Sequence, residues 1–190
     1  MAKTGRTNIF SGFSLILTVL VIALNACAIN RTVMVGISPD IQVKYGIYPS
    51  IELDVAAVTD DEAKQVKSDG TDGYFSQDNP IRKRLEPFTA YFDEETTAPR
   101  ELHNWEEIWG KWQKKKPSQL LIIADLPHSP DMPKDDPRMI FINIKKTLFT
   151  PSSIFIEIEP AKIVRVYKRP TDPRGKDGKP ASKVDDTGMQ

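Results

Sequence analysis

The sequence predicts a mainly β domain, an antiparallel β-sandwich of six to seven strands with one short inserted amphipathic helix. Three observations predict it. Short stretches in which apolar and polar residues alternate recur along the chain. Turn signals separate these stretches, and the chain contains 15 prolines. A clear helical repeat of apolar residues stands out at one place, where the three tryptophans lie.

The strand signals are strongest near the C-terminus. Ile154, Ile156 and Ile158 alternate with Phe155 and Glu157, which is typical of a half-buried strand. The continuous apolar stretch in 118–126 instead predicts a central strand that is covered on both faces. We expect strands at 32–37, 50–58, 88–92, 118–126, 138–144, 153–159 and 161–167.

The segments between the strands are read from their turn residues and polarity. Residues 38–49 hold two prolines and Gly46, so we expect a loop with some extended structure. The polar, acidic segment 59–73 is expected to be a solvated excursion, and 79–85 one short helical turn. Residues 127–137 contain four prolines and are expected to form a loop.

The predicted helix covers 103–113. Trp105, Trp109 and Trp112 would share one face of it, because they are four and seven residues apart. Packing of this aromatic face against the sheet is one interpretation. A surface that binds a partner or a membrane is the other, since tryptophan is enriched in both settings.

The N-terminus has the pattern of a secretory signal. Lys3 and Arg6 precede a stretch without charge from Ile9 to Ile29, and small residues follow its apolar core. The last four residues of this segment, Leu24, Asn25, Ala26 and Cys27, resemble the lipobox that lipoprotein signal peptidase cleaves in bacteria. That resemblance implies cleavage before Cys27, which would carry a diacylglycerol and an N-acyl chain.

An uncleaved transmembrane anchor is the alternative, because 9–29 is long enough to cross a bilayer. It would make the protein a single-pass protein of the inner membrane. In the lipoprotein interpretation, Ala28 in place of an aspartate after Cys27 implies the periplasmic face of the outer membrane. We therefore expect a signal peptide at 1–26, a short lipid-anchored linker at 27–31, the β-sandwich at 32–169 and a disordered tail at 170–190.

Composition argues against several functions. The chain has 26 basic and 26 acidic residues, which speaks against a nucleic-acid surface. One cysteine and two histidines, none in a ligand pattern, predict no metal site and no cofactor beyond the acyl chains. No catalytic residues are predicted, since no nucleophile elbow, Walker loop or dinucleotide fingerprint is present, and we do not expect an enzyme.

Two stretches after the lipobox resemble the outer-membrane lipoprotein of the type VI secretion membrane complex, the TssJ-like family. Residues 33–41 (VMVGISPDI) are similar to the family's first strand and its exit, and 49–55 (PSIELDV) to its second strand. The likeness covers about 28–90, whereas 91–137 depart from the family pattern.

The resemblance implies a structural role. The protein would tether the secretion complex to the outer membrane by binding the periplasmic part of the large inner-membrane subunit. In the family the loop after the first strand contacts that partner, which implies Lys44, Tyr45 and Tyr48 here; folding of these aromatics over the core is the other interpretation. A solute- or glycan-binding lipoprotein that uses the tryptophan face and a membrane-anchored hydrolase with a scattered site remain alternatives.

Overall fold

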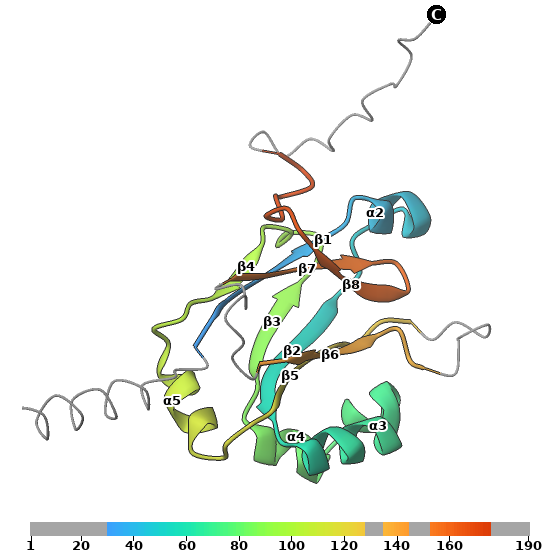
Figure 1. Ribbon diagram of the computed structural model, residues 1–190. Helices are drawn as coiled ribbons and strands as arrows, with labels where there is room; N and C mark the ends of the chain where they lie inside the picture. The colour runs from blue at the N-terminus through green and yellow to red at the C-terminus, as the bar shows by residue number, and fades with distance from the viewer. Residues whose placement is uncertain (1–29, 128–134, 145–152, 176–190) are drawn as a thin grey trace, which may run out of the picture.

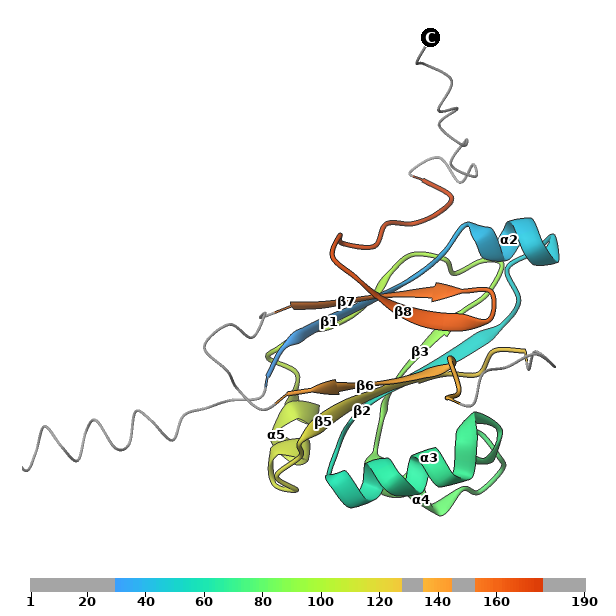
Figure 2. The ribbon, with the colours of Figure 1, turned by 45° about the vertical axis from the view of Figure 1, so that its right-hand side comes forward.

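Two four-stranded β-sheets face each other, and helices cover the outer side of one of them (Figures 1 and 2). The computed structural model describes residues 30–127, 135–144 and 153–175. The first sheet, in spatial order, contains β4 (Arg100–Leu102), β1 (Thr32–Ile37), β7 (Ser153–Glu159) and β8 (Lys162–Val166). The second contains β3 (Phe88–Phe92), β2 (Ile51–Val58), β5 (Gln119–Ala124) and β6 (Met139–Asn143).

Strand pairing is antiparallel except between β1 and β7. These two strands run parallel, with Val33 opposite Ile154 and Val35 opposite Ile156. Because residues at matching positions project to the same face, the valines and isoleucines point together into the space between the sheets. The predicted β-sandwich is thus confirmed, with one parallel pair inside the first sheet.

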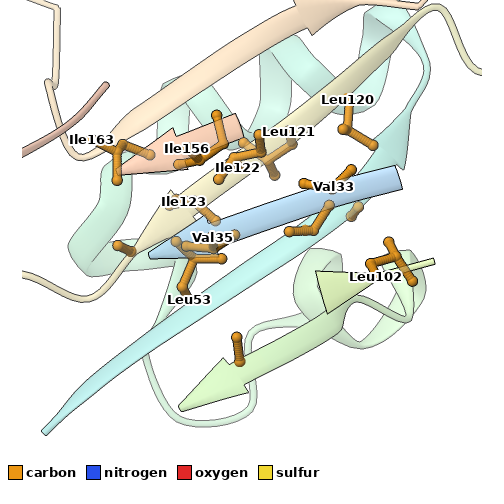
Figure 3. Close-up of a cluster of buried hydrophobic side chains, with 14 of the residues drawn as sticks. Val33, Val35, Leu53, Leu102, Leu120, Leu121, Ile122, Ile123, Ile156 and Ile163 are labelled. Atoms are coloured by element: carbon orange, nitrogen blue, oxygen red, sulfur yellow. The ribbon is translucent and has the colours of Figure 1, made fainter. Parts of the chain in front are cut away.

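The core lies between the two sheets and is built from alternate strand residues. Val33 and Val35 of the first sheet face Leu53, Leu120 and Ile122 of the second, and each of the five is at most 1% exposed (Figure 3). Complete burial of such a side chain contributes about 1.5–3 kcal/mol to stability. The alternation that predicted the strands is therefore the pattern that fills this core.

A second apolar layer lies on the outer face of the second sheet. Helix α3 (Asp60–Tyr74) covers it together with α4 (Pro80–Leu85). Leu121 and Ile123 of β5 face this layer and are fully buried. Strand β5 is thus covered on both faces, as its continuous apolar sequence predicts.

The helices differ most from the sequence-based expectation. Besides the helical turn expected at 79–85, which is α4, the structure contains α2 (Asp40–Tyr45), α3 and α5 (Glu107–Gln113). The predictions of a loop at 38–49, a solvated excursion at 59–73 and a single inserted helix were therefore wrong. Thr59 and Glu62 form a capping box at the start of α3, a start signal that the polar composition of the segment hides.

The strand predictions were closer. All seven expected strands are present, with bounds that differ by at most two residues from those expected. An eighth, β4, was missed, because three residues are too few to show alternation. Pairing with β1, where Leu102 lies opposite Val33, is what holds this segment extended.

The chain enters the domain beside α5. The side-chain amide of Asn30 donates a hydrogen bond of 2.9 Å to the carbonyl of Asn104, and that of Gln113 donates to Asn30. Arg31 is 5% exposed and donates to the carbonyl of Ile144 over 3.2 Å. These contacts fix the direction in which the chain reaches β1.

The other end of the described chain also contacts the domain. The Arg174 guanidinium donates to the carbonyls of Glu94 and Glu95 over 2.9 and 2.7 Å. Residues 170–175, the beginning of the expected tail, therefore pack on the loop after β3. In the part of the chain that the structure describes, no helix has the length and apolar character that a membrane crossing requires.

Candidate partner-binding surface

Helix α2 follows β1 directly and forms one end of the domain (Figure 1). Asp40 lies in its first turn, where a carboxylate interacts favourably with the helix dipole. Gly46 ends the helix with a φ of 79°, and its N–H donates to the Gln42 carbonyl over 2.8 Å. Glycine adopts this left-handed conformation at no steric cost, which is why the helix stops here.

Helix α2 buries one apolar residue, and apolar residues in it and directly after Gly46 are exposed. Ile41 is fully buried, whereas Val43 is 76% and Ile47 is 56% exposed. Lys44 is exposed beside them. We call Val43, Lys44, Tyr45 and Ile47 the α2 surface.

Tyr45 fastens α2 to the turn between β7 and β8. Its hydroxyl donates a hydrogen bond of 2.7 Å to the carbonyl of Pro160, and its ring packs against the core. The Lys44 ammonium lies 5.4 Å from the centre of the same ring, within range of a cation–π interaction. The exposed apolar residues are therefore presented on a supported helix and by the residue that follows its glycine cap.

Tyr48 lies inside the domain. It is 2% exposed, and its backbone N–H donates to the Glu94 carboxylate over 2.9 Å. Burial raises the pKa of the Tyr48 phenol, and the negative charge of Asp172 adds to this effect. Of the three residues implied for partner contact, Lys44 and Tyr45 reach the surface, whereas Tyr48 is buried.

Val43 and Ile47 were not among the candidates. The sequence IQVKYGIY contains their signal, because a helical reading places Ile41 on the face opposite Val43, with Gly46 as the stop. Because a loop was predicted here, the difference between the buried and the exposed side of this segment was missed.

An open groove of about 620 Å³ adjoins the start of α2. It lies between β8 and the segment that follows it, and its lining is mixed in charge. The lining includes Pro39, Arg165, Tyr167, Arg169, Pro170 and Asp172. Tyr167 is 97% exposed, so an accessible aromatic side chain borders the groove.

The predicted tryptophan face does not exist as one surface. Helix α5 begins at Glu107, so Trp105 precedes it and is 72% exposed. Trp109 and Trp112 are fully buried, with their indole N–H groups donating to the carbonyl of His103 and to those of Leu85 and Glu86. The prediction of a helix from 103 with all three rings on one face was therefore wrong, because the turn before α5 rotates Trp105 outward.

A buried polar cluster lies on the outer face of the second sheet. Asp54 is fully buried and accepts hydrogen bonds from Tyr74 (3.0 Å), Arg82 Nε (2.7 Å) and Thr89 (2.6 Å). Burial opposes the charge on Arg82, but hydrogen bonds to Asp54 and Glu52 outweigh it and raise the pKa of the guanidinium. The carboxylate is saturated with donors, so the cluster joins α3 and α4 to β2.

The described residues contain no group of three or more histidine, cysteine, aspartate or glutamate side chains placed to hold a metal ion. The lipobox residues Leu24, Asn25 and Ala26, and Cys27 after them, lie outside the described part of the chain. Their roles remain predictions from the sequence.

The sequence matches no protein-family model and no curated protein. Solved structures match the fold. A structure described as the T6SS protein TssM C-terminal domain from EAEC gives a TM-score of 0.50 at 11% identity, over 72% of this chain and 99% of that chain.

Two further structures are similar at lower scores. Serratia marcescens Lip, a membrane-bound component of the Type VI Secretion System, gives a TM-score of 0.45 at 11% identity, over 72% of this chain and 96% of that one. The T6SS lipoprotein TssJ1 from Pseudomonas aeruginosa gives 0.38 at 13% identity, over 71% and 92%.

The likeness at a TM-score of 0.50 shows that this chain shares the fold of the TssM C-terminal domain, which belongs to a type VI secretion protein. Identity of 11% transfers no individual residue from that structure to this chain. The candidate surface therefore stands on its own geometry.

Proposed function

We propose that this protein is a lipid-anchored, periplasmic assembly component of a type VI secretion membrane complex. Acyl chains on Cys27 would hold it to the outer membrane. The α2 surface would bind the periplasmic C-terminal part of the complex's large inner-membrane subunit. The role is structural, and no reaction is assigned to the protein.

One observation carries the proposal: the point where the chain enters the domain and helix α2 lie at opposite ends of β1. Asn30, three residues after Cys27, is fastened beside α5, and α2 follows the far end of the strand. The six residues of β1 span about 20 Å at the usual rise of a strand. An anchor at one end thus presents α2 away from the membrane, which is the geometry that a tether requires.

The chemistry of the α2 surface defines the partner. Val43 and Ile47 supply exposed apolar area, and Lys44 lies at its margin. Protein interfaces combine such an apolar centre with a polar rim. The fitting partner surface is an apolar patch bordered by carboxylates.

The tryptophan-dependent glycan-binding alternative loses its basis. Stacking on sugar rings requires accessible indole faces, and Trp109 and Trp112 are fully buried. One exposed tryptophan, Trp105, does not form the extended aromatic platform that this alternative assumed.

The anchor is tested by metabolic labelling. Because Cys27 is the single cysteine of the chain, Cys27→Ala should abolish incorporation of labelled palmitate. Cys27→Ser serves as the conservative variant and should also lose the label. Retained label in either variant would contradict the lipid anchor.

The partner is tested separately by copurification. The full chain, extracted in mild detergent, should retain the separately produced periplasmic C-terminal part of the large subunit through a size-exclusion column. Cys27→Ala should bind that part equally well, because the anchor and the α2 surface lie at different ends. If neither the wild type nor Cys27→Ala forms a complex with that part of the subunit, the proposed partner is overturned and the anchor still stands.

A further inference from the structure

The end of the domain beside the anchor carries an exposed aromatic residue that the proposed partner contact does not use. Trp105 is 72% exposed, and its ring stacks on His103 with 4.2 Å between the centroids and 8° between the planes. His103 is in turn held by Glu101, whose Oε1 lies 3.1 Å from Nδ1. The indole is therefore exposed to solvent but held in one orientation.

The chain enters the domain at the same place. Asn30 accepts from Gln113 and donates to the carbonyl of Asn104, the residue before Trp105. Only three residues of chain, which span at most about 11 Å, separate Cys27 from Asn30. A lipid on Cys27 thus brings the bilayer surface to this end of the domain.

The charge at this end suits a lipid surface. Lys114 and Lys116 are exposed directly after α5, and Lys115 donates to the carbonyl of Arg84 over 2.6 Å. Glu106 and Glu107 precede them, so the stretch from 106 to 116, which also contains Lys111, carries a net charge of two positive units. Basic residues near a membrane are attracted to anionic headgroups.

We propose that this α5 end, formed by Trp105, Lys114 and Lys116, rests on the membrane surface, with the Trp105 indole at the level of the lipid headgroups. The inference depends on the lipid anchor of the proposed function and adds an orientation to it. Tryptophan is enriched at this depth because its ring is apolar and its N–H is polar. Contact at two points, the acyl chains and Trp105, holds the domain upright and directs α2 away from the membrane.

The test uses the full lipidated chain in vesicles of phosphatidylethanolamine and phosphatidylglycerol, some with brominated acyl chains. Because Trp109 and Trp112 are buried, the brominated lipid should quench the tryptophan fluorescence of the wild type but not that of Trp105→Phe. Iodide in the aqueous phase should quench Trp105 strongly in a form that begins at Ala28, which lacks both the signal segment and Cys27, and weakly in the vesicles. Near-ultraviolet circular dichroism establishes that each variant is folded.

A second variant provides the matched control. In the Trp105→Phe background, Val43→Trp places an indole at a 76% exposed position on α2, at the other end of the domain. Bromine should leave it unquenched, and iodide should quench it with and without vesicles. Lys114→Glu combined with Lys116→Glu should reduce quenching of Trp105 when phosphatidylglycerol is present.

The outcomes separate the inference from the anchor. A chain that floats with the vesicles while Trp105 stays open to iodide overturns the orientation and leaves the anchor standing. A chain that does not float overturns both. Protection of Trp105 from iodide by a bound protein, without bromine quenching, also overturns the membrane contact.

Discussion

The hydroxyl of Tyr45 lies 2.7 Å from the carbonyl oxygen of Pro160, in the turn between β7 and β8. This hydrogen bond connects residues 115 positions apart and holds a six-residue helix against the first sheet. A helix of that length is not stable alone in water. The presentation of Val43 and Ile47 therefore depends on Tyr45.

Tyr45→Phe is expected to loosen α2 while leaving the domain folded. Loss of one such hydrogen bond lowers the free energy of unfolding by about 1 kcal/mol. Amide hydrogen exchange should accelerate in α2 and remain unchanged in β2. Tyr167→Phe, at a 97% exposed position, is the control and should change neither quantity.

Asp54→Ala is expected to be one of the most destabilising single substitutions. It removes a fully buried acceptor and leaves Arg82, Tyr74 and Thr89 without their shared partner. Breaking a buried ion pair in this way costs about 3–5 kcal/mol, to be measured by urea unfolding. Asp61→Ala removes an exposed pair with Lys64 and should cost no more than about 0.5 kcal/mol. Equal losses for the two variants would contradict the structural role of the cluster.

Acid should weaken the ion pair between Asp136 and Arg138, which lies just before β6. Burial would raise the pKa of Asp136, but the hydrogen bonds from Arg138 outweigh it and hold that pKa below its ordinary 3.8. A depressed pKa means stabilisation that is fully present above the ordinary value and is lost as the pH falls through the folded one. Asp136→Asn should therefore destabilise the domain at neutral pH, by an amount that shrinks as the pH falls below 3.8.

The control for Asp136 is its exposed neighbour. Asp135→Asn should alter the free energy of unfolding by no more than about 0.5 kcal/mol at neutral pH. A destabilisation by Asp136→Asn that is as large at about pH 3 as at neutral pH would show that its effect comes from packing rather than from charge.

The tryptophans should divide into two classes. Trp112→Ala removes a fully buried ring in edge-to-face contact with Trp109, 5.1 Å between centroids, and should cost about 3–5 kcal/mol. Trp105→Ala should change the free energy of unfolding by no more than about 0.5 kcal/mol, because its ring is mostly exposed. If denaturant unfolding shows comparable losses of unfolding free energy for the two variants, the division is contradicted.

Patterns that repeat every two residues allowed most of the sheet to be predicted from the sequence. Ile154, Ile156 and Ile158 alternate because one face of β7 meets the core. The pairing order could not be predicted, since the parallel contact of β1 with β7 joins segments about 120 residues apart. Nor could β4, which is extended because Leu102 pairs beside Val33.

The helices and the candidate site were harder to predict. Helix α3 is mostly polar because only the Ala63 and Val66 side of it meets the sheet. Gly70, with a φ of 68°, interrupts its helical pattern. Lys44 and Tyr45 were placed by resemblance to a family, but the burial of Tyr48 depends on contacts with Glu94, a residue far along the chain.

Binding to the large inner-membrane subunit tests the central claim most directly. Val43→Asp combined with Ile47→Asp should weaken the affinity of the full chain for the subunit's periplasmic C-terminal part at least tenfold in titration calorimetry. Gln65→Glu combined with Ser68→Asp, both on the exposed side of α3, adds the same charge and should bind like the wild type. Unchanged affinity in the double variant, with its fold intact by circular dichroism, would contradict the assignment of the α2 surface.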